Sequence, residues 1–285
     1  MLLFAVFACS TAAILIKVST THPTLLGALR LLIAAVLLAP LAWRDHRKLP
    51  GKFTVVHAQR IVWPAFVLAA HFVSWGFGAR MTLSAQASLV VNLAPVALPF
   101  FLHALVGERI TPREISGTVL ALCGVLLLGA RDAFVPGGDV WGNVVCFGSM
   151  LLFAWYLALG RRNRDFPTLW LYVVPVYAVA GAVCLVVSLP WIGRFEFAST
   201  REWMLIAGLA VVPTIVGHSL LNLSMRHLRG QVVSLCNVGQ FVFAGALAWL
   251  LFDEVPRPIF YLASALVVAG VAMVVLRAPA QPRMR

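Results

Sequence analysis

Two histidines occupy matching places in two long apolar stretches of the sequence. His71 lies near the middle of the third stretch, and His218 lies within one residue of the symmetric position in the eighth. Trp75 and Asn222 follow them by four residues, a spacing that puts each on the same helical face as its histidine. Such faces would line a cavity, where the histidines would bind a substrate or relay protons. The structural alternative for the two histidines is a neutral ring that donates to a backbone carbonyl between helices. The structural alternative for Trp75 is an aromatic side chain at the membrane interface.

Two basic side chains also fall within apolar stretches. Lys17 lies toward the end of the first stretch, and Arg30 lies deeper inside the second. One interpretation is an electropositive site for a substrate carboxylate. The alternatives are snorkelling of the side chain to the headgroups and, for Arg30, an essential internal pair. The deeper position of Arg30 favours function, whereas Lys17 matches Arg161 at a helix end in the second half of the chain.

Further polar and aromatic residues complete the candidate cavity. Asn92 and Gln240 are amides in the fourth and ninth stretches, where they would contact a substrate or hydrogen-bond between helices. Trp155 and Tyr156 would face the cavity or pack toward lipid.

The ten carboxylates of the chain all map to loops or helix ends. A carrier of cationic drugs usually needs a buried carboxylate, because an unpaired cation in hydrocarbon is costly. The sequence therefore favours a neutral, zwitterionic or anionic substrate, although aromatic faces can also bind cations.

Glu108 and Glu254 each lie at a turn between two apolar stretches. They precede the first-turn prolines Pro112 and Pro258, so the positive end of the following helix favours their charge. We expect a stabilising role, with gating as the alternative.

The composition predicts an all-α membrane protein. Of 285 residues, 61% are hydrophobic and 11% charged, and a helix that crosses the hydrocarbon needs about 20 apolar residues. We expect no cleavable signal peptide, since the first stretch is needed to complete a repeat. The predicted spans are residues 2–19, 25–43, 61–79, 86–106, 114–131, 139–159, 168–190, 202–224, 231–252 and 258–277.

The two halves of the chain repeat each other. Residues 107–112 recur as 253–258, an offset of 146 positions at which Glu108 matches Glu254 and Gly124 matches Gly270. The predicted domains are residues 1–132 and 139–277, followed by a cytoplasmic tail at 278–285. An odd number of spans in each half makes the second copy inverted, an arrangement typical of secondary transporters.

The net charge of +12 reflects topology rather than nucleic-acid binding. With the N-terminus in the cytoplasm, fifteen Lys and Arg fall on inner segments and five on outer loops. This bias predicts a multi-pass inner-membrane protein with both termini inside, in contact with anionic lipids.

Other classes of function lack their motifs. The five cysteines are dispersed in apolar stretches, so we expect neither disulfides nor a metal site. There is no Walker loop, dinucleotide fingerprint, HExxH or GxSxG, so we expect no enzyme and no cofactor. The expected partners are a small-molecule substrate and the bilayer, without nucleic acid, and the expected assembly is a monomer. A membrane enzyme or receptor would need a polar cluster at one membrane face, and a channel would lack saturable counterflow.

Several runs of residues along the chain are typical of one family of membrane proteins, among them residues 28–32, 71–75, 92–95, 107–112, 124–128, 155–157, 160–162, 217–218 and 253–255. With these runs the sequence resembles two EamA-type domains of the drug/metabolite transporter superfamily. The resemblance covers nearly the whole chain and implies a ten-helix permease that moves small metabolites by alternating access, with amino acid export foremost. It also implies that spans one, three, four, six, eight and nine surround the cavity while five and ten are peripheral. Uptake or exchange of organic anions and export of cationic drugs remain alternatives.

The chain departs from the family pattern in the ninth span. Such proteins often have a proline there that corresponds to Pro95, a structural or gating position in the fourth span. The offset of 146 places Phe241 at that point. A mechanism that needs two symmetric proline kinks is therefore not expected.

Overall fold

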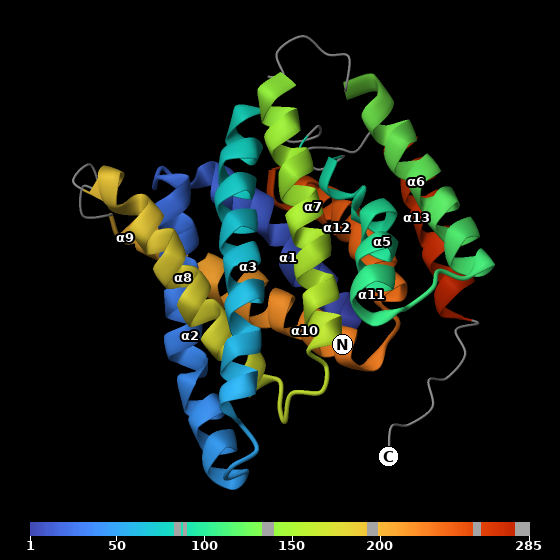
Figure 1. The fold of residues 1–285 in the computed structure, drawn as a ribbon. Coiled ribbons are helices and arrows are strands. Elements are labelled where there is room, and N and C mark those ends of the chain that lie inside the picture. Colours follow the sequence, from blue (N-terminus) through green and yellow to red (C-terminus); the bar gives the residue numbers. More distant parts are fainter. Residues whose placement is uncertain (83–86, 88–89, 133–139, 193–198, 253–257, 277–285) are drawn as a thin grey trace.

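The computed structural model describes residues 1–82, 87, 90–132, 140–192, 199–252 and 258–276, and no strand occurs among them (Figure 1). The helices in chain order are α1 (Leu2–Val18), α2 (Pro23–Lys48), α3 (Val55–Met81), α5 (Ala94–Val106), α6 (Pro112–Asp132), α7 (Val140–Arg162), α8 (Trp170–Ile192), α9 (Thr200–Leu209), the π-helix η1 (Ala210–His218), α10 (Ser219–His227), α11 (Gly230–Val238), α12 (Gln240–Phe252) and α13 (Pro258–Val275).

Several of the helices have the length and composition of membrane spans. In the described part of the chain, seven helical segments are long and apolar enough to cross a bilayer. One of them is the continuous run α9–η1–α10, Thr200–His227, and another joins α11 to α12. α1 and α5 are apolar but shorter. These helices make a multi-pass membrane protein, as the composition predicts.

The second and third spans are longer than predicted. α2 continues to Lys48 and α3 begins at Val55, so most of the hydrophilic piece between the two predicted spans is helical. The basic last turn of α2 suits the negative end of the helix dipole. Thr54 begins α3 with a capping box in which His57 takes the usual place of a glutamate. These polar turns lack the hydropathy on which the prediction relied.

The fourth and ninth spans are both interrupted. Leu93 ends a turn in which its N–H donates to Val90 O (3.1 Å), and Gly239 ends a turn in which its N–H donates to Cys236 O (3.0 Å). Leu93 and Gly239 are 146 positions apart. The ninth span is therefore interrupted at the position that matches the break in the fourth span, although it has Phe241 where the fourth span has Pro95.

Pro95 lies in the first turn of α5, where proline costs little. Pro99 has no N–H to donate to the carbonyl four residues earlier, and that carbonyl, on Pro95, accepts from Gln231 Nε2 (2.9 Å). The proline pair thus connects α5 to α11.

η1 was not predicted within the eighth span. Pro213 has no N–H for the Leu209 carbonyl, and the Thr214 hydroxyl donates to that carbonyl at 2.7 Å. Wide turns of this kind are common at functional sites. η1 packs on α1 closely enough that a Cβ on Gly217 would lie 2.6 Å from Cys9 Sγ.

The helices pack in pairs, and their buried apolar residues form more than one cluster. α2 packs along α8, α3 along α7, and α6 along α13. The pair α6 and α13 lies at one side of the molecule (Figure 1). Leu31, Leu68 and Tyr177 are fully buried in the core that the first two pairs share. Among the residues whose side chains the structure describes, α6 and α13 contribute none to the cavity described below, as expected for peripheral spans.

Candidate functional site

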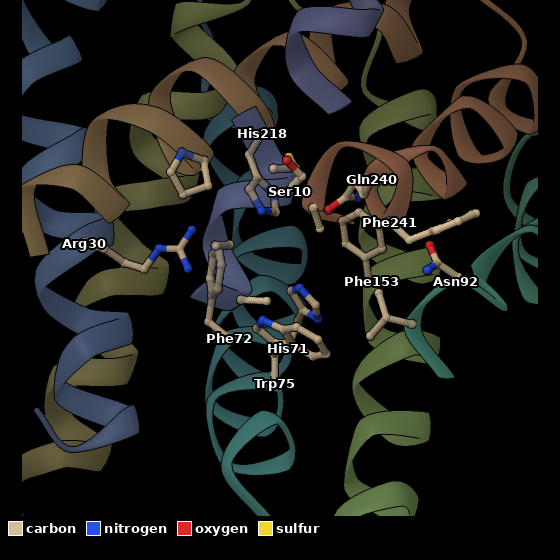
Figure 2. Close-up of a pocket in the computed structure, with 16 residues that line it drawn as sticks. Ser10, Arg30, His71, Phe72, Trp75, Asn92, Phe153, His218, Gln240 and Phe241 are labelled. Atoms are coloured by element: carbon tan, nitrogen blue, oxygen red, sulfur yellow. The ribbon is translucent and has the colours of Figure 1, made fainter. Parts of the chain in front are cut away.

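A cavity of about 90 Å³ lies between helices of both halves of the chain. Its walls come from α1, α2, α3, α7, η1, α12 and the turn before α5 (Figure 2). α2, which was not expected among the surrounding spans, takes part through Arg30. Six predicted residues line the cavity: Arg30, His71, Trp75, Asn92, His218 and Gln240.

Asn92 and Gln240 reach the cavity because both lie beside the interruptions of their spans. Asn92 precedes Leu93, and Gln240 follows Gly239. Figure 2 shows them together on the side of the cavity opposite Arg30. The symmetric breaks thus deliver one amide from each half.

Three predicted residues do not line the cavity. Lys17 is exposed near the end of α1. Tyr156 and Asn222 lie behind His218, where Asn222 Nδ2 donates to Tyr156 Oη (2.7 Å) and to the His218 carbonyl (2.8 Å). Both side chains are buried and are not among the residues that line the cavity, and Asn222 bonds the backbone of His218, so we assign them a supporting place behind it. Trp155 instead stacks on Phe101, with ring centroids 5.9 Å apart.

His71 is held by α7. Its Nδ1 lies 3.0 Å from the Ser149 carbonyl and 2.9 Å from Ser149 Oγ, while Ser149 Oγ lies 3.1 Å from the His71 carbonyl. A carbonyl can only accept, so Nδ1 carries a proton and Nε2 of the neutral ring is an acceptor. The backbone contact considered as the structural alternative is therefore present in a residue that also lines the cavity.

His218 faces the same space from η1. Its ring centroid lies 6.5 Å from that of His71, 5.2 Å from Phe72 and 6.0 Å from Phe153. His218 Nδ1 is buried and has no hydrogen-bond partner among the described residues. The site therefore combines two imidazoles with two phenyl rings.

Arg30 is the only described cation that lines the cavity, and its side chain is buried with 2% exposure. Nε donates to Thr214 Oγ1 (2.9 Å), and Cζ lies 4.3 Å from the centroid of Phe72 (Figure 2). Nη2 is buried with no partner among the described residues. Arg30 also forms no ion pair with any carboxylate that the structure describes.

Sequence reasoning missed several lining residues. Phe72 and Phe153 are apolar, and a phenyl ring in a membrane span gives no signal that separates cavity from lipid. Thr214 supports the site from η1, and a hydroxyl directly after Pro213 could have indicated it, because such a hydroxyl can replace the missing donor.

Glu108 closes one end of the bundle. Its carboxylate accepts from Arg161 Nε (3.0 Å) and from the Gly230 backbone N–H (3.0 Å), and Arg161 Nη1 donates to Met225 O (2.8 Å). Glu108 therefore links the first half to two segments of the second. Its repeat partner Glu254 and the tail at 278–285 lie outside the described residues.

A second polar cluster lies at the opposite end of the bundle. Glu202, in the first turn of α9, accepts from Ser19 Oγ (2.7 Å), Thr21 Oγ1 (2.9 Å) and the Thr20 N–H (3.1 Å). Arg80 Nη2 donates to the carbonyls of Ser19 and Thr21. These bonds fix the turn between α1 and α2 against α3 and α9.

Comparisons with known proteins agree with this architecture. The aromatic amino acid exporter YddG of Ancylobacter novellus is 25% identical over 232 residues, 76% of this chain and 77% of the exporter. A transporter of Archaeoglobus fulgidus, described as uncharacterized, is 26% identical over 193 residues, 67% of each chain. A solved crystal structure shares the fold with a TM-score of 0.79 and 20% identity over 95% of both chains. The profile of the EamA-like transporter family matches residues 1–130 and 140–276, so the chain belongs to that family.

Proposed function

We propose that this protein is a secondary transporter that moves small neutral or zwitterionic metabolites, amino acids foremost, across the inner membrane. The observation that carries the proposal is the polar and aromatic cavity that helices of both halves enclose. A site shared between two halves is what alternating access requires, because rocking of one half against the other changes its accessible side. The similarity to an aromatic amino acid exporter supports the substrate class and the direction of export.

We further propose that the fold consists of ten spans in two inverted halves, and two contacts support this. Arg80 and Arg226 are 146 positions apart. Arg80 donates to the Thr21 carbonyl (2.8 Å), and Arg226 donates to the Phe166 carbonyl (2.6 Å). Each arginine thus ties the third span of its half to the turn between the first two.

The packing of α6 on α13 gives a second line of support. A Cβ on Gly270 would lie 2.5 Å from the Gly117 carbonyl, and a Cβ on Gly124 would lie 2.6 Å from the Ala263 carbonyl. The offset of 146 exchanges these two contacts. A two-fold relation between the halves accounts for both.

The excess of basic residues at one end supports a cytoplasmic location for both termini. The link between Glu108 and Arg161 would then lie on the cytoplasmic side, and Glu202 on the outer side. Trp75 and Asn92, which line the cavity, lie in the outer parts of their spans.

The volume of about 90 Å³ is below the roughly 300–1,000 Å³ of typical ligand sites. Substrate entry would need the cavity to widen. Among the described residues no carboxylate lines the cavity, which disfavours the alternative of a cationic drug exporter. The buried Arg30 keeps organic anions as a second candidate class.

Counterflow in proteoliposomes tests the transport proposal. Vesicles preloaded with an amino acid mixture should accumulate the transported member of an external labelled set. His71→Ala and His218→Ala should reduce that rate by about 10-fold or more, since each removes polar and ring contacts of the cavity. His103→Ala is the matched control, because His103 is exposed on α5 and does not line the cavity. Unchanged rates in both cavity variants would refute the assigned site, and absence of counterflow would refute transport.

A further inference from the structure

We infer that Arg30 is the receptor for a carboxylate group of the transported molecule, so that the substrates are small carboxylates, zwitterionic or anionic. This inference rests on the proposed function and specifies its substrate class. It begins from a buried guanidinium that lines the cavity while its Nη2 has no partner among the described residues.

The charge of Arg30 is not balanced by the described part of the protein. The five carboxylates whose side chains the structure describes are Asp45, Glu108, Glu114, Asp165 and Glu202, and each is bonded elsewhere. A buried arginine is ordinarily paired, because an uncompensated charge in a medium of low dielectric is costly. A ligand that brings one negative charge would supply the missing counter-ion.

The surroundings of Arg30 hold the guanidinium in a fixed orientation. Thr214 Oγ1 accepts from Nε, and that hydroxyl is itself fixed by donation to the Leu209 carbonyl. The ring of Phe72 lies against Cζ at 4.3 Å. Two of the three guanidinium nitrogens are thereby left for a ligand, and this planar donor pair matches a carboxylate.

The rest of the cavity suits the remainder of such a molecule. Phe72 lies between Arg30 and His218, whose ring is 5.2 Å from it and whose Nδ1 has no partner among the described residues. Nε2 of a neutral His71 and the unprotonated nitrogen of a neutral His218 can each accept from an ammonium group. Phe153 and Trp75 offer apolar faces to a side chain. An α-amino acid has these three features together.

The site is also one-sided. The run Pro23-Thr24-Leu25 recurs as Pro167-Thr168-Leu169, an offset of 144 that makes Val174 the counterpart of Arg30 in the repeat. Val174 is buried and apolar. A symmetric structural role would have a basic partner in the second half, whereas a single receptor needs none.

Thermal stability of the detergent-purified protein tests the inference with paired probes. L-Phenylalanine and 3-phenylpropanoate carry the carboxylate, while L-phenylalaninamide and 2-phenylethylamine lack it. L-Alanine and L-alaninamide repeat the comparison with a smaller side chain, in case the cavity admits only small ligands. The proteins are wild type, Arg30→Gln, Arg30→Lys and Lys17→Gln, which removes an exposed cation away from the cavity.

The carboxylate probes should stabilise wild type and Lys17→Gln alike. Their Kd should rise by about 10-fold or more in Arg30→Gln, while probes without a carboxylate should keep the same Kd. Arg30→Lys keeps the charge but loses the planar fork, so it should weaken the carboxylate probes alone. Arg30→Lys decides the question if Arg30→Gln does not fold.

The inference is overturned if Arg30 variants weaken all probes equally, or if no carboxylate stabilises wild type more than Arg30→Gln. Counterflow of the same probes separates this result from the proposed function. If L-phenylalaninamide shows counterflow and no probe shows Arg30-dependent binding, the proposed transport function stands and the role of Arg30 as carboxylate receptor is refuted. If binding depends on Arg30 but no probe shows counterflow, the role of Arg30 as carboxylate receptor stands and the proposed transport function is refuted.

Discussion

Thr214 joins the backbone of η1 to the charge in the cavity. Its hydroxyl donates to the Leu209 carbonyl and accepts from Arg30 Nε. A valine has the same shape without the hydroxyl, so Thr214→Val would remove both bonds and leave the buried Arg30 Nε without its acceptor. An unsatisfied buried polar group costs about 1–3 kcal/mol.

We therefore expect Thr214→Val to lower the melting temperature of the purified protein by several degrees. Thr214→Ser keeps the hydroxyl and should remain close to wild type. Carboxylate binding should also weaken in Thr214→Val, because Arg30 would lose its fixed orientation. Equal melting temperatures for the two variants would contradict the role given to the hydroxyl.

Individual site residues were predictable where a polar group stands out in an apolar stretch. Five residues could be predicted for that reason and do line the cavity: Arg30, His71, Asn92, His218 and Gln240. Phe72 and Phe153 could not be found, because a membrane span contains many phenylalanines with no role beyond packing. Lys17 was included on its charge alone, and the structure puts it on the surface.

At the scale of elements, the pair α6–α13 depends on glycines at which the backbones touch. A Cβ on Gly270 would lie 2.5 Å from the Gly117 carbonyl and 2.9 Å from the Ala121 nitrogen. Backbone atoms cannot rotate away as a flexible side chain can, so the helices would have to separate. In a membrane such close contact is a main source of helix association.

Gly270→Ala should therefore destabilise the protein by about 1–3 kcal/mol, as overpacking does in other tight interiors. Gly148→Ala is the matched control, because its Cβ in α7 would meet no atom within 4 Å. Alanine favours a helix over glycine, so this variant should melt at or above the wild-type temperature. The packing argument fails if Gly270→Ala melts as late as Gly148→Ala.

Hydropathy predicted a multi-pass membrane protein, but it did not predict the internal geometry of the spans. The predicted span 202–224 corresponds to α9, η1 and α10, and its π-helical part depends on Pro213 and a buried hydroxyl. The interruption at Gly239 occurs without a proline and is fixed by a single turn. Both features arise from local hydrogen bonds that a hydropathy pattern does not encode.

At the scale of the whole molecule, the sequence repeat predicts more symmetry than the cavity has. The two halves share the arginines Arg80 and Arg226, the breaks at Leu93 and Gly239, and the contact of α6 with α13. Among the described residues, Arg30 of the first half is the only Lys or Arg that lines the cavity, and Val174 takes its place in the second half. Duplicated scaffolding therefore surrounds a single site, and the repeat could indicate where that site lies but not its polarity.

The single charge also bears on how the carrier cycles. If the bound carboxylate neutralises Arg30, the empty carrier must reorient with an unpaired cation at membrane depth, and the loaded carrier need not. A difference of about 1.4 kcal/mol between the free-energy barriers for reorientation of the empty and the loaded carrier corresponds to about 10-fold in rate. Exchange of a carboxylate substrate should therefore be several-fold faster than its net efflux into vesicles without substrate.

Arg30→Gln removes the charge from the empty carrier, so it should bring the two rates together when substrate is saturating. The measurement is efflux of labelled substrate from proteoliposomes with and without unlabelled substrate outside. Lys17→Gln should keep the wild-type ratio, because that cation is exposed and lies away from the cavity. A wild-type protein with equal exchange and net efflux would show that the empty carrier reorients freely, and the charge of Arg30 would then be compensated within the protein.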